Sequence, residues 1–394
     1  MHEPDNAHAL RLGEEHDPRI RLTLAPPPSE RLRHPVRAPC ASAPLRHVAP
    51  TCGWGAAAHP EYAPWVAENP LLAIPGMEAG LARVEVALRE SVRSDDPFLT
   101  EVASHLITAG GKRVRPAFAL AAASTSLEGG SGEVSDEVVM GAVAVELVHL
   151  GSLYHDDVMD EATTRRTVES VNAKWGNLQA ILAGDFLLAR ASEIAASLGV
   201  EIAALLASTI GRLCEGQVRE LRDTYNAGRT EADYLSSIEG KTASLFATAC
   251  RVGAIVGGLP RDEIDALTEF GLRFGMAFQI VDDILDVTAT DEQLGKPAGH
   301  DLVEGVYTLP VIRTIAAGGA PDLAGLLGGP LEADQLDRAR AFVRSDGAVA
   351  SSLETAAAYA QSAIESLHPL PHATAALRLG EAAQHLLAGV RAAA

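Results

Sequence analysis

Apolar residues recur every three or four positions along most of the chain, from Met77 to near its C-terminal end. This spacing places them on one face of an α-helix. Alternating β-branched runs between hairpin turns, which would indicate strands, are missing from the sequence. The pattern therefore predicts an all-α fold, a single large domain of roughly ten or more helices. The clearest helical segments are 77–91, 116–126, 133–160, 184–197, 201–224, 231–256, 261–286, 335–343 and 374–392.

Residues 1–76 lack this pattern. They hold 13 of the 22 prolines of the chain and no lysine. Such a segment buries too little apolar surface to offset the entropy lost on ordering, so we expect a disordered, proline-rich leader. A regulatory or docking arm is an alternative interpretation, as is a true start of translation at Met77. The folded domain is predicted to span residues 77–394.

Composition narrows the range of partners and compartments. The 394 residues include 52 Asp and Glu against 32 Lys and Arg, a formal charge of −20. Binding to nucleic acid depends largely on Lys and Arg that neutralise phosphates, so this balance argues against nucleic acid as the main partner. The four cysteines lack the spacing of a zinc site. No apolar run has the length of a transmembrane segment. We expect a cytoplasmic protein.

Two clusters of aspartates end apolar helical segments. The first is Asp156, Asp157 and Asp160, and the second is Asp282, Asp283 and Asp286. Residues four apart share a helix face, so the carboxylates of a cluster repel one another unless a divalent cation joins them. Oxygen ligands without Cys or His favour Mg²⁺. One such cluster could be a solvated helix end, but its recurrence favours a metal site, with all six aspartates as ligands and catalytic residues.

Basic residues accompany both clusters. The segment 110–116, GGKRVRP, places a glycine turn and three cations before a proline that suits the first turn of a helix, an arrangement that can hold an anion. Mg²⁺ together with Arg and Lys is well suited to holding a diphosphate. The other candidates for this role are Arg165, Arg166, Lys241, Thr242 and Lys296.

These motifs resemble those of the trans-type isoprenyl (polyprenyl) diphosphate synthases. Segment 110–116 is similar to the GGKRxRP motif of that family, and 155–166, HDDVMDEATTRR, to its first aspartate-rich motif. GKT at 240–242 matches the family's GKT, and FQIVDDILD at 278–286 with GKP at 295–297 is similar to the second motif. The match runs from about residue 80 to the C-terminus. It implies a helical bundle of the isoprenoid synthase type with a central cavity.

The resemblance also implies a chain-elongating prenyltransferase that acts as a homodimer with a trio of Mg²⁺ ions in each active site. An allylic diphosphate would ionise, and the double bond of isopentenyl diphosphate would add to the resulting cation. His155 is expected to lie beside the site. The resemblance places isopentenyl diphosphate on Lys112, Arg115, His149 and Arg166. It places the allylic diphosphate on Arg165, Lys241, Thr242, Gln279 and Lys296.

Two segments depart from the family pattern. Thr167, Val168 and Glu169 follow the paired arginines, where the family has Gly-x-Pro, so we expect a loop of different shape. In the segment 304–310, EGVYTLP, Val306 stands where many members carry the lysine of EGKxTLP. One cation near the allylic diphosphate is therefore missing, which predicts an effect on substrate affinity more than on catalysis.

Product length is expected to depend on Gly151 and Ser152, which precede Asp156 by five and four residues. The family carries aromatic residues there when its products are short, so these small residues predict a C30 to C50 all-trans polyprenyl diphosphate. Geranylgeranyl diphosphate (C20) is the alternative product. A non-catalytic subunit of a heteromeric synthase, a terpene cyclase and a purely structural helical bundle remain open, although such a subunit typically loses acids and all six are present here.

Overall fold

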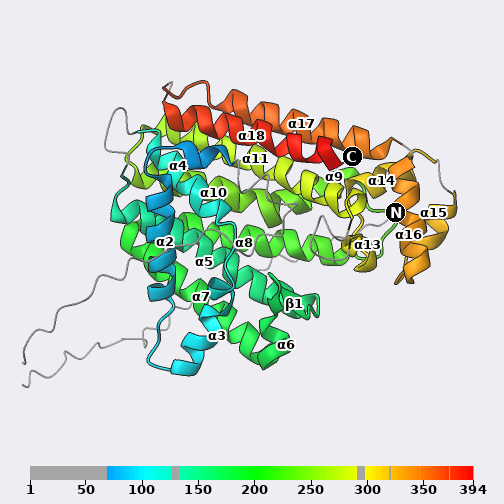
Figure 1. The fold of residues 1–394 in the computed structure, drawn as a ribbon, viewed down its shortest axis with the longest axis horizontal. Helices are drawn as coiled ribbons and strands as arrows, with labels where there is room; N and C mark the ends of the chain where they lie inside the picture. Colours follow the sequence, from blue (N-terminus) through cyan, green and yellow to red (C-terminus); the bar gives the residue numbers. More distant parts are fainter. Residues whose placement is uncertain are drawn as a thin grey trace, which may run out of the picture. The chain divides into compact units, whose positions relative to one another are not determined.

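The computed structural model describes residues 69–126, 133–290, 298–318, 321–345, 347–371 and 373–393. The expected leader up to residue 68 and Lys296 lie outside these ranges. The described residues are mostly helical, which confirms the all-α prediction (Figure 1). The elements are η1 (Pro70–Ala73), α2 (Met77–Ser91), α3 (Pro97–Thr108), α4 (Val114–Ser124), α5 (Asp136–Met159), β1 (Thr164–Arg165), β2 (Val168–Glu169), α6 (Val171–Trp175), α7 (Asn177–Leu198), α8 (Val200–Arg222), α9 (Glu231–Ile238), η2 (Glu239–Ala243), α10 (Ser244–Val256), α11 (Arg261–Thr288), α13 (His300–Val303), α14 (Leu309–Ala316), α15 (Pro321–Leu326), α16 (Ala333–Ser345), α17 (Ala348–Ser366) and α18 (Thr374–Ala393).

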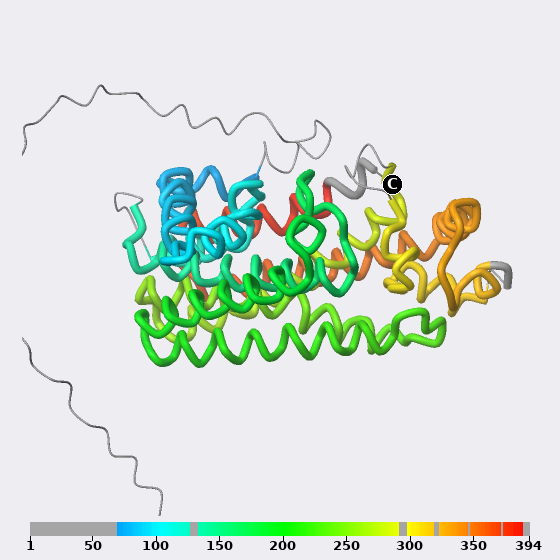
Figure 2. The backbone as a smooth tube through the Cα atoms, turned by 90° about the horizontal axis from the view of Figure 1, so that it is seen from below, coloured from blue at the N-terminus to red at the C-terminus, as the bar shows by residue number. Residues whose placement is uncertain are grey.

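Helix α5 lies at the centre of the domain. It packs against α2, α4, α7 and α10, and α11 packs on the far side of α10. Among the described helices, α5 is the one long and apolar enough to cross a membrane, but 72% of its apolar window is buried inside the domain. A helix that is apolar all round suits the core of a large soluble fold, and α5 has that place here. Figure 2 shows α8 along the edge of these helices.

Five phenylalanines join α4, α10 and α11 in a core otherwise rich in Ala, Val and Leu. The ring centroids of Phe118 and Phe274 lie 4.4 Å apart, and those of Phe118 and Phe246 lie 5.5 Å apart. Aromatic pairs at such distances add to the stability that burial itself provides. The cluster thereby fixes α11, which carries the second aspartate cluster, against α4 and α10. Its members are Phe118, Phe246, Phe270, Phe274 and Phe278.

A second, smaller core surrounds the C-terminal end of α11. Val287 of α11 packs there with Leu302 of α13, Tyr307 and Val311, and with Val343 of α16. All five side chains are almost completely buried. This core fixes the segment between α13 and α14 beside the end of α11, where it faces the second aspartate cluster.

The folded domain begins before Met77, where the apolar spacing placed its start. The side chain of Asn69 caps η1 by accepting a hydrogen bond from the amide of Leu71 at 3.0 Å. Leu71 is fully buried and Ile74 is 3% exposed, and η1 contacts α2, α4 and α18. Residues 69–76 therefore belong to the helical domain. The sequence pattern missed them because one short turn between prolines contributes too few apolar residues to show a period.

Candidate active site

A cavity of about 360 Å³ lies where α5 and α8 end and where α11 carries its aspartates. Asp160 of the first cluster and Asp283 of the second both line it, so the fold brings the two clusters together as the sequence predicts. Lys241 and Gln279 line it as well. The other lining residues are Met159, Glu161, Gln217, Glu220, Leu221, Thr224, Arg229, Tyr234, Ile238, Asp301, Glu304, Val306 and Thr308.

Asp283 is held by a chain of hydrogen bonds from three elements. The Thr242 hydroxyl donates to Oε1 of Gln279 at 2.7 Å, and Nε2 of Gln279 donates to Oδ1 of Asp283 at 2.7 Å. The Tyr234 hydroxyl donates to Oδ2 of Asp283 at 2.6 Å. Burial raises the pKa of Asp283 to about 7, although these hydrogen bonds oppose the shift. Thr242 and Gln279 thus orient the carboxylate of Asp283.

Asp156 and Asp160 lie near Lys241 at the end of α5. Burial and the neighbouring carboxylate of Glu304 raise the pKa of Asp160 to about 6, and burial also raises the pKa of Asp156. Burial alone would lower the pKa of Lys241, but Glu220, Asp156 and Asp160 together raise it. Nζ of Lys241 donates to Oε1 of Glu220 at 2.5 Å. This end of the cavity therefore holds more negative charge than its lysine neutralises.

Lys241 reaches the cavity because η2 is a π-helical turn that packs very closely on α8. A Cβ atom on Gly216 of α8 would lie 2.4 Å from the Lys241 amide nitrogen, and one on Gly240 would lie 2.9 Å from the Arg212 carbonyl oxygen. Both positions therefore require glycine. The glycine that precedes Lys241 in the sequence has this packing role.

Asp157 and Asp286 point to other partners. Nε and Nη2 of Arg165 both lie 2.6 Å from Oδ1 of fully buried Asp157, whose Oδ2 has no hydrogen-bond partner among the described residues. Oδ1 and Oδ2 of Asp286 accept hydrogen bonds from the amides of His300 and Asp301 at 3.3 and 3.2 Å, at the start of α13. Asp286 therefore fixes the start of α13, and Arg165 is paired with Asp157. Asp282 is exposed.

Arg115, His149 and Arg166 lie within electrostatic reach of one another, and together with Lys112 they are the four predicted isopentenyl diphosphate ligands, which we call the cradle. Burial, followed by Arg115 and Arg166, lowers the pKa of His149 well below its ordinary value, so the imidazole is neutral at pH 7. Burial lowers the pKa of Arg115 to about 10, and its Nε is buried without a hydrogen-bond partner in the described structure. Desolvation lowers the pKa of Lys112, and Asp282 opposes the shift. The cradle is a concentration of positive charge within electrostatic reach of the second aspartate cluster.

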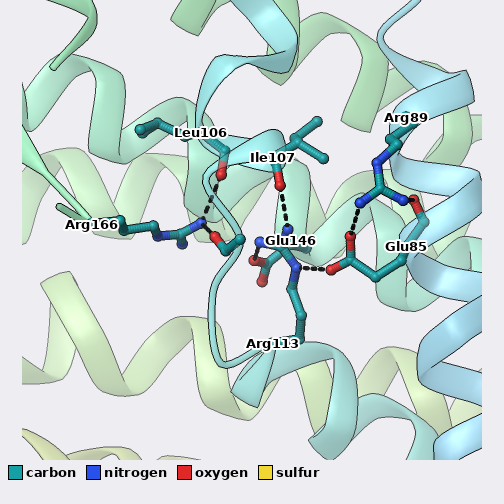
Figure 3. Close-up of polar contacts among 8 residues, drawn as sticks. Glu85, Arg89, Leu106, Ile107, Arg113, Glu146 and Arg166 are labelled. Atoms are coloured by element: carbon teal, nitrogen blue, oxygen red, sulfur yellow. Dashed lines mark hydrogen bonds and ion pairs between the residues drawn. The ribbon is translucent and has the colours of Figure 1, made fainter. Parts of the chain in front are cut away.

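Arg113 and Glu146 form an ion pair, and Glu146 lies within electrostatic reach of Arg115 and Arg166 of the cradle (Figure 3). Nη1 of Arg113 donates to Oε1 of Glu146 at 2.9 Å, Nη2 donates to the Ile107 carbonyl at 3.2 Å, and Nε pairs with Glu85. The Arg113 and Glu146 side chains are each 2% exposed. Arg113 begins α4 with a left-handed backbone (φ 45°), which turns the glycine segment into the helix. Glu146 was not anticipated from the sequence. The feature that could have indicated it is the presence of an acid inside an otherwise apolar helical segment.

Arg166 sits in a tight hairpin between β1 and β2. Thr164 pairs with Glu169, and Arg165 pairs with Val168. The two turn residues, Arg166 and Thr167, have φ values of 54° and 64°, a left-handed geometry that favours glycine. Thr167 stands where the family carries glycine, so this chain keeps a tight turn with a residue that fits it poorly. Nη1 of Arg166 donates to the Leu106 carbonyl at 3.0 Å and also to the Gly110 carbonyl, which ties the hairpin to the glycine segment.

Gly151 packs between helices and is not among the residues that line the cavity. A Cβ atom there would lie 3.1 Å from the Gly184 carbonyl oxygen and 3.1 Å from Cγ of Leu188, both on α7. Ser152 is half-buried, and its hydroxyl donates to the His149 carbonyl at 2.8 Å. His155 also faces α7, with Nε2 3.3 Å from the Ile181 carbonyl oxygen and 3.4 Å from Oδ1 of Asp185. Gly151 thus permits the close approach of α5 and α7.

The cavity residues that were not anticipated from the sequence include Glu220, Arg229 and Tyr234. Each contacts a partner far along the chain, such as Asp283, which lies 49 positions after Tyr234. No local motif marks them. The sequence gives one indirect indication. Val306 stands where many family members carry a lysine, so another segment could supply the cation.

A helical fold that joins paired aspartate clusters to an arginine cradle defines the class of all-helical prenyltransferases. Residues 96–343 match the polyprenyl synthetase family, and the chain belongs to that family. It is 40% identical to a nonaprenyl diphosphate synthase of Mycobacterium tuberculosis over 299 residues, 75% of this chain and 88% of the relative. It is 36% identical to heptaprenyl diphosphate synthase component 2 of Bacillus subtilis over 305 residues, 77% of this chain and 86% of the relative.

A solved structure agrees with this assignment. The fold is similar to that of a polyprenyl synthase from Caulobacter crescentus, solved with calcium and isoprenyl diphosphate. The TM-score is 0.75 at 35% sequence identity, over 81% of this chain and 96% of that chain. Both the sequence family and the helical architecture predicted from the motifs are therefore confirmed.

Proposed function

We propose that this protein is a Mg²⁺-dependent prenyltransferase that condenses isopentenyl diphosphate with an allylic diphosphate to give a medium- or long-chain polyprenyl diphosphate. The observation that carries the proposal is the pairing of an acidic cavity with a basic cradle. Asp282 is close enough to Lys112 to oppose the lowering of the Lys112 pKa by burial, and Arg165 is close enough to Asp156 to oppose the raising of the Asp156 pKa by burial. Two diphosphates bound at these two places would meet at the end of α5.

The side chains fit Mg²⁺. Buried Asp157 Oδ2 has no hydrogen-bond partner among the described residues, and burial raises the pKa of Asp156, Asp160 and Asp283 because no cation compensates them fully. Among the described residues no group of three or more His, Cys, Asp or Glu side chains is arranged to hold a metal ion by itself, so the ions would depend on ligands from the substrate as well. Mg²⁺ commonly completes its octahedron with water and substrate phosphates. Asp156, Asp157, Asp160, Asp282 and Asp283 would hold a trio of ions, while Asp286 fixes the start of α13.

The chain's own residues bind the leaving group and order the reaction. Bound Mg²⁺ would stabilise the charge that develops on the departing diphosphate. Lys241 adds a positive charge on the same side, and Tyr234 remains protonated as a donor because burial and Asp283 raise its pKa. The allylic C–O bond breaks, and the electron pair of the isopentenyl double bond forms the new C–C bond. A proton passes from the former isopentenyl unit to the departed diphosphate, which yields a chain longer by five carbons and free protonated diphosphate.

The cradle gives the isopentenyl substrate its orientation. Lys112, Arg115 and Arg166 are cationic donors for its diphosphate, and neutral His149 can donate one further hydrogen bond. Their backbone is fixed by the glycine segment and the β1–β2 hairpin, so little ordering remains to be done when the substrate binds.

The relatives support a product between C30 and C50, since those similar to this chain include a nonaprenyl and a heptaprenyl diphosphate synthase. A geranylgeranyl product (C20) is the alternative. The structure changes how product length should be tested at α5. Gly151→Phe would push into the α7 backbone and is expected to destabilise the fold by about 1 to 3 kcal/mol. Ser152→Phe avoids that clash and is expected to shorten the product.

A direct assay tests the activity. Purified protein, Mg²⁺, farnesyl or geranylgeranyl diphosphate and radiolabelled isopentenyl diphosphate should give products longer than C25 on reversed-phase chromatography. Products that stop at C20 when farnesyl diphosphate is the primer would contradict the proposed length. No incorporation with any allylic primer would contradict the proposed activity of the chain on its own.

A second candidate function comes from the similarity to heptaprenyl diphosphate synthase component 2, which by its name is one part of a two-component enzyme. We propose a homodimer that is active alone. Light scattering coupled to size exclusion, followed by the assay on the same fraction, checks this. An active fraction with the mass of two chains supports the homodimer. An inactive fraction that gains activity with a second polypeptide supports the two-component enzyme.

We further propose a cytoplasmic location. The apolar helix α5 supports it, because its apolar surface is used for packing inside the domain. Fractionation of cells that express the full chain should recover it in the soluble fraction, and recovery in washed membranes would contradict the proposal.

A further inference from the structure

Arg229 lies in the connection between α8 and α9, and its side chain is buried with unused hydrogen-bond donors. The residue is 4% exposed. Nη1 donates to the Tyr307 carbonyl at 3.0 Å. Nε forms an ion pair with Oδ2 of Asp223 at 3.8 Å, beyond hydrogen-bond distance, and neither Nε nor Nη2 has a hydrogen-bond partner in the described part of the chain. Buried donors without hydrogen bonds are costly, so these two nitrogens point to a ligand.

The unused donors belong to the wall of the catalytic cavity. Arg229 lines that cavity together with Asp160, Asp283 and Val306. Its guanidinium carbon lies 5.5 Å from the ring centroid of Tyr234, whose hydroxyl donates to Asp283. Arg229 is therefore one side chain away from a carboxylate of the second aspartate cluster.

Charge distinguishes Arg229 from the other cation in the described lining. Lys241 already donates to Glu220 at 2.5 Å. Arg229 has two adjacent donors, Nε and Nη2, without hydrogen-bond partners in the described structure. This edge of a guanidinium matches two oxygens of a phosphate group in a bidentate arrangement. The cavity also holds six acidic side chains, which would attract metal ions rather than a free anion: Asp160, Glu161, Glu220, Asp283, Asp301 and Glu304.

Arg229 lies close to position 306, where this chain lacks the lysine that many family members carry. Val306 occupies the place of a lysine in the EGKxTLP pattern, and it lines the same cavity. The Tyr307 carbonyl that accepts from Arg229 is on the next residue. A lysine at position 306 and the guanidinium of Arg229 would therefore serve the same part of the cavity from two different segments.

We propose that Arg229 binds the diphosphate of the allylic substrate through Nε and Nη2 and supplies the cation that position 306 lacks. This inference rests on the proposed function. It also removes the reason to expect weak substrate binding from the valine alone, since the missing charge is restored by another segment.

Steady-state kinetics of Arg229→Met test the proposal. We expect the KM for the allylic diphosphate to rise about 10- to 100-fold, the loss typical of hydrogen bonds to charged groups, with the KM for isopentenyl diphosphate nearly unchanged. Adding Val306→Lys to Arg229→Met should recover most of the loss. Arg222→Met removes an exposed arginine that is not in the cavity lining and should match the wild type.

Calorimetry with inorganic diphosphate and Mg²⁺ gives a readout that does not need turnover. Arg229→Met should weaken this binding by a factor similar to the KM change, and circular dichroism and melting temperature should show that the variant is folded. Arg229→Gln replaces Arg229→Met in every comparison if the latter does not fold. An unchanged allylic KM, an equal rise in both KM values, or no recovery with Val306→Lys would overturn the proposal. Wild-type protein without turnover would instead reject the proposed function, while the calorimetry still decides the role of Arg229.

Discussion

The cradle and the acidic cavity respond to burial in opposite ways. In the cradle, burial lowers the pKa of Arg115 to about 10 and keeps His149 neutral. In the cavity, burial raises the pKa of Asp160 to about 6 and that of Asp283 to about 7. The physical cause is the same, since desolvation disfavours whichever form is charged. Cations therefore outnumber anions in the cradle, and acids outnumber cations in the cavity.

This difference in charge explains how two similar ligands, the two diphosphate substrates, can bind at separate places. A diphosphate fits the cradle directly, because the cradle has an excess of positive charge. The acids of the cavity would repel a diphosphate in the absence of metal ions. Metal ions that these acids attract would change the local charge, so that the second diphosphate could bind there. Four experiments test this difference in charge between the cradle and the cavity.

Glu146→Gln removes the carboxylate that compensates the positive charge of the cradle. Arg113, Arg115 and Arg166 all lie within its electrostatic reach. Loss of one partner from a buried ion pair is expected to lower the free energy of unfolding by about 3 to 5 kcal/mol, measured by urea denaturation. Glu90→Gln, in an exposed pair with Arg93, should cause little change. Equal effects of both substitutions would show that the cradle does not depend on its buried acid.

Asp283→Asn tests the charge of the cavity while it keeps the size of the side chain. We expect kcat to fall by about 10²- to 10³-fold, as for the loss of one electrostatic group at a reacting centre. Radiolabel incorporation at saturating Mg²⁺ measures it, and an unchanged melting profile shows that the fold is intact. Thr242→Val, which removes only the outer end of the hydrogen-bond chain, should have a smaller effect. Activity of Asp283→Asn within threefold of wild type would rule out Asp283 as a ligand that matters.

Mg²⁺ activation should depend on pH with a definite sign. Carboxylates bind the metal when they are deprotonated, and the raised pKa values of Asp160 and Asp283 mean that protons compete below about pH 7. The Mg²⁺ concentration for half-maximal activity should therefore rise as the pH falls from 8 to 6, by up to about tenfold per pH unit for each proton displaced. Titrations of activity against Mg²⁺ at fixed ionic strength show this. A concentration that is independent of pH would mean that these acids are ionised throughout.

Thr167→Gly tests the strained turn that presents Arg166. A β-branched residue at φ 64° costs about 1 kcal/mol, which glycine would relieve, so the melting temperature should rise. Thr164→Gly in β1 is the matched control. Its backbone is not left-handed, so glycine there should lower the melting temperature by loosening the unfolded chain. A lower melting temperature for both variants would mean that the turn is not strained.

The sequence was informative where the evidence is local. Helical spacing, aspartates four apart and glycines before basic residues all lie within one or two turns of chain, and they gave the fold class and most of the charged residues. Contacts between helices carry no such signal. Arg229 and Tyr307 are 78 positions apart, and Arg113 and Glu146 are 33 apart. The packing of Gly151 against α7 was equally invisible, because it depends on how closely two helices approach.

The π-helical turn η2 lets one nearly continuous helix serve two partners. A regular α-helix turns by about 100° per residue, so one additional residue in a turn rotates everything after it by that angle. Tyr234, before η2, reaches Asp283 in the cavity, and Phe246, after it, packs with Phe118 and Phe274 in the core. Deleting one residue from 239–243 would make the helix regular but would turn one of these side chains away from its partner. The irregular turn thus sets the rotation about the helix axis between the part that faces the cavity and the part that packs in the core.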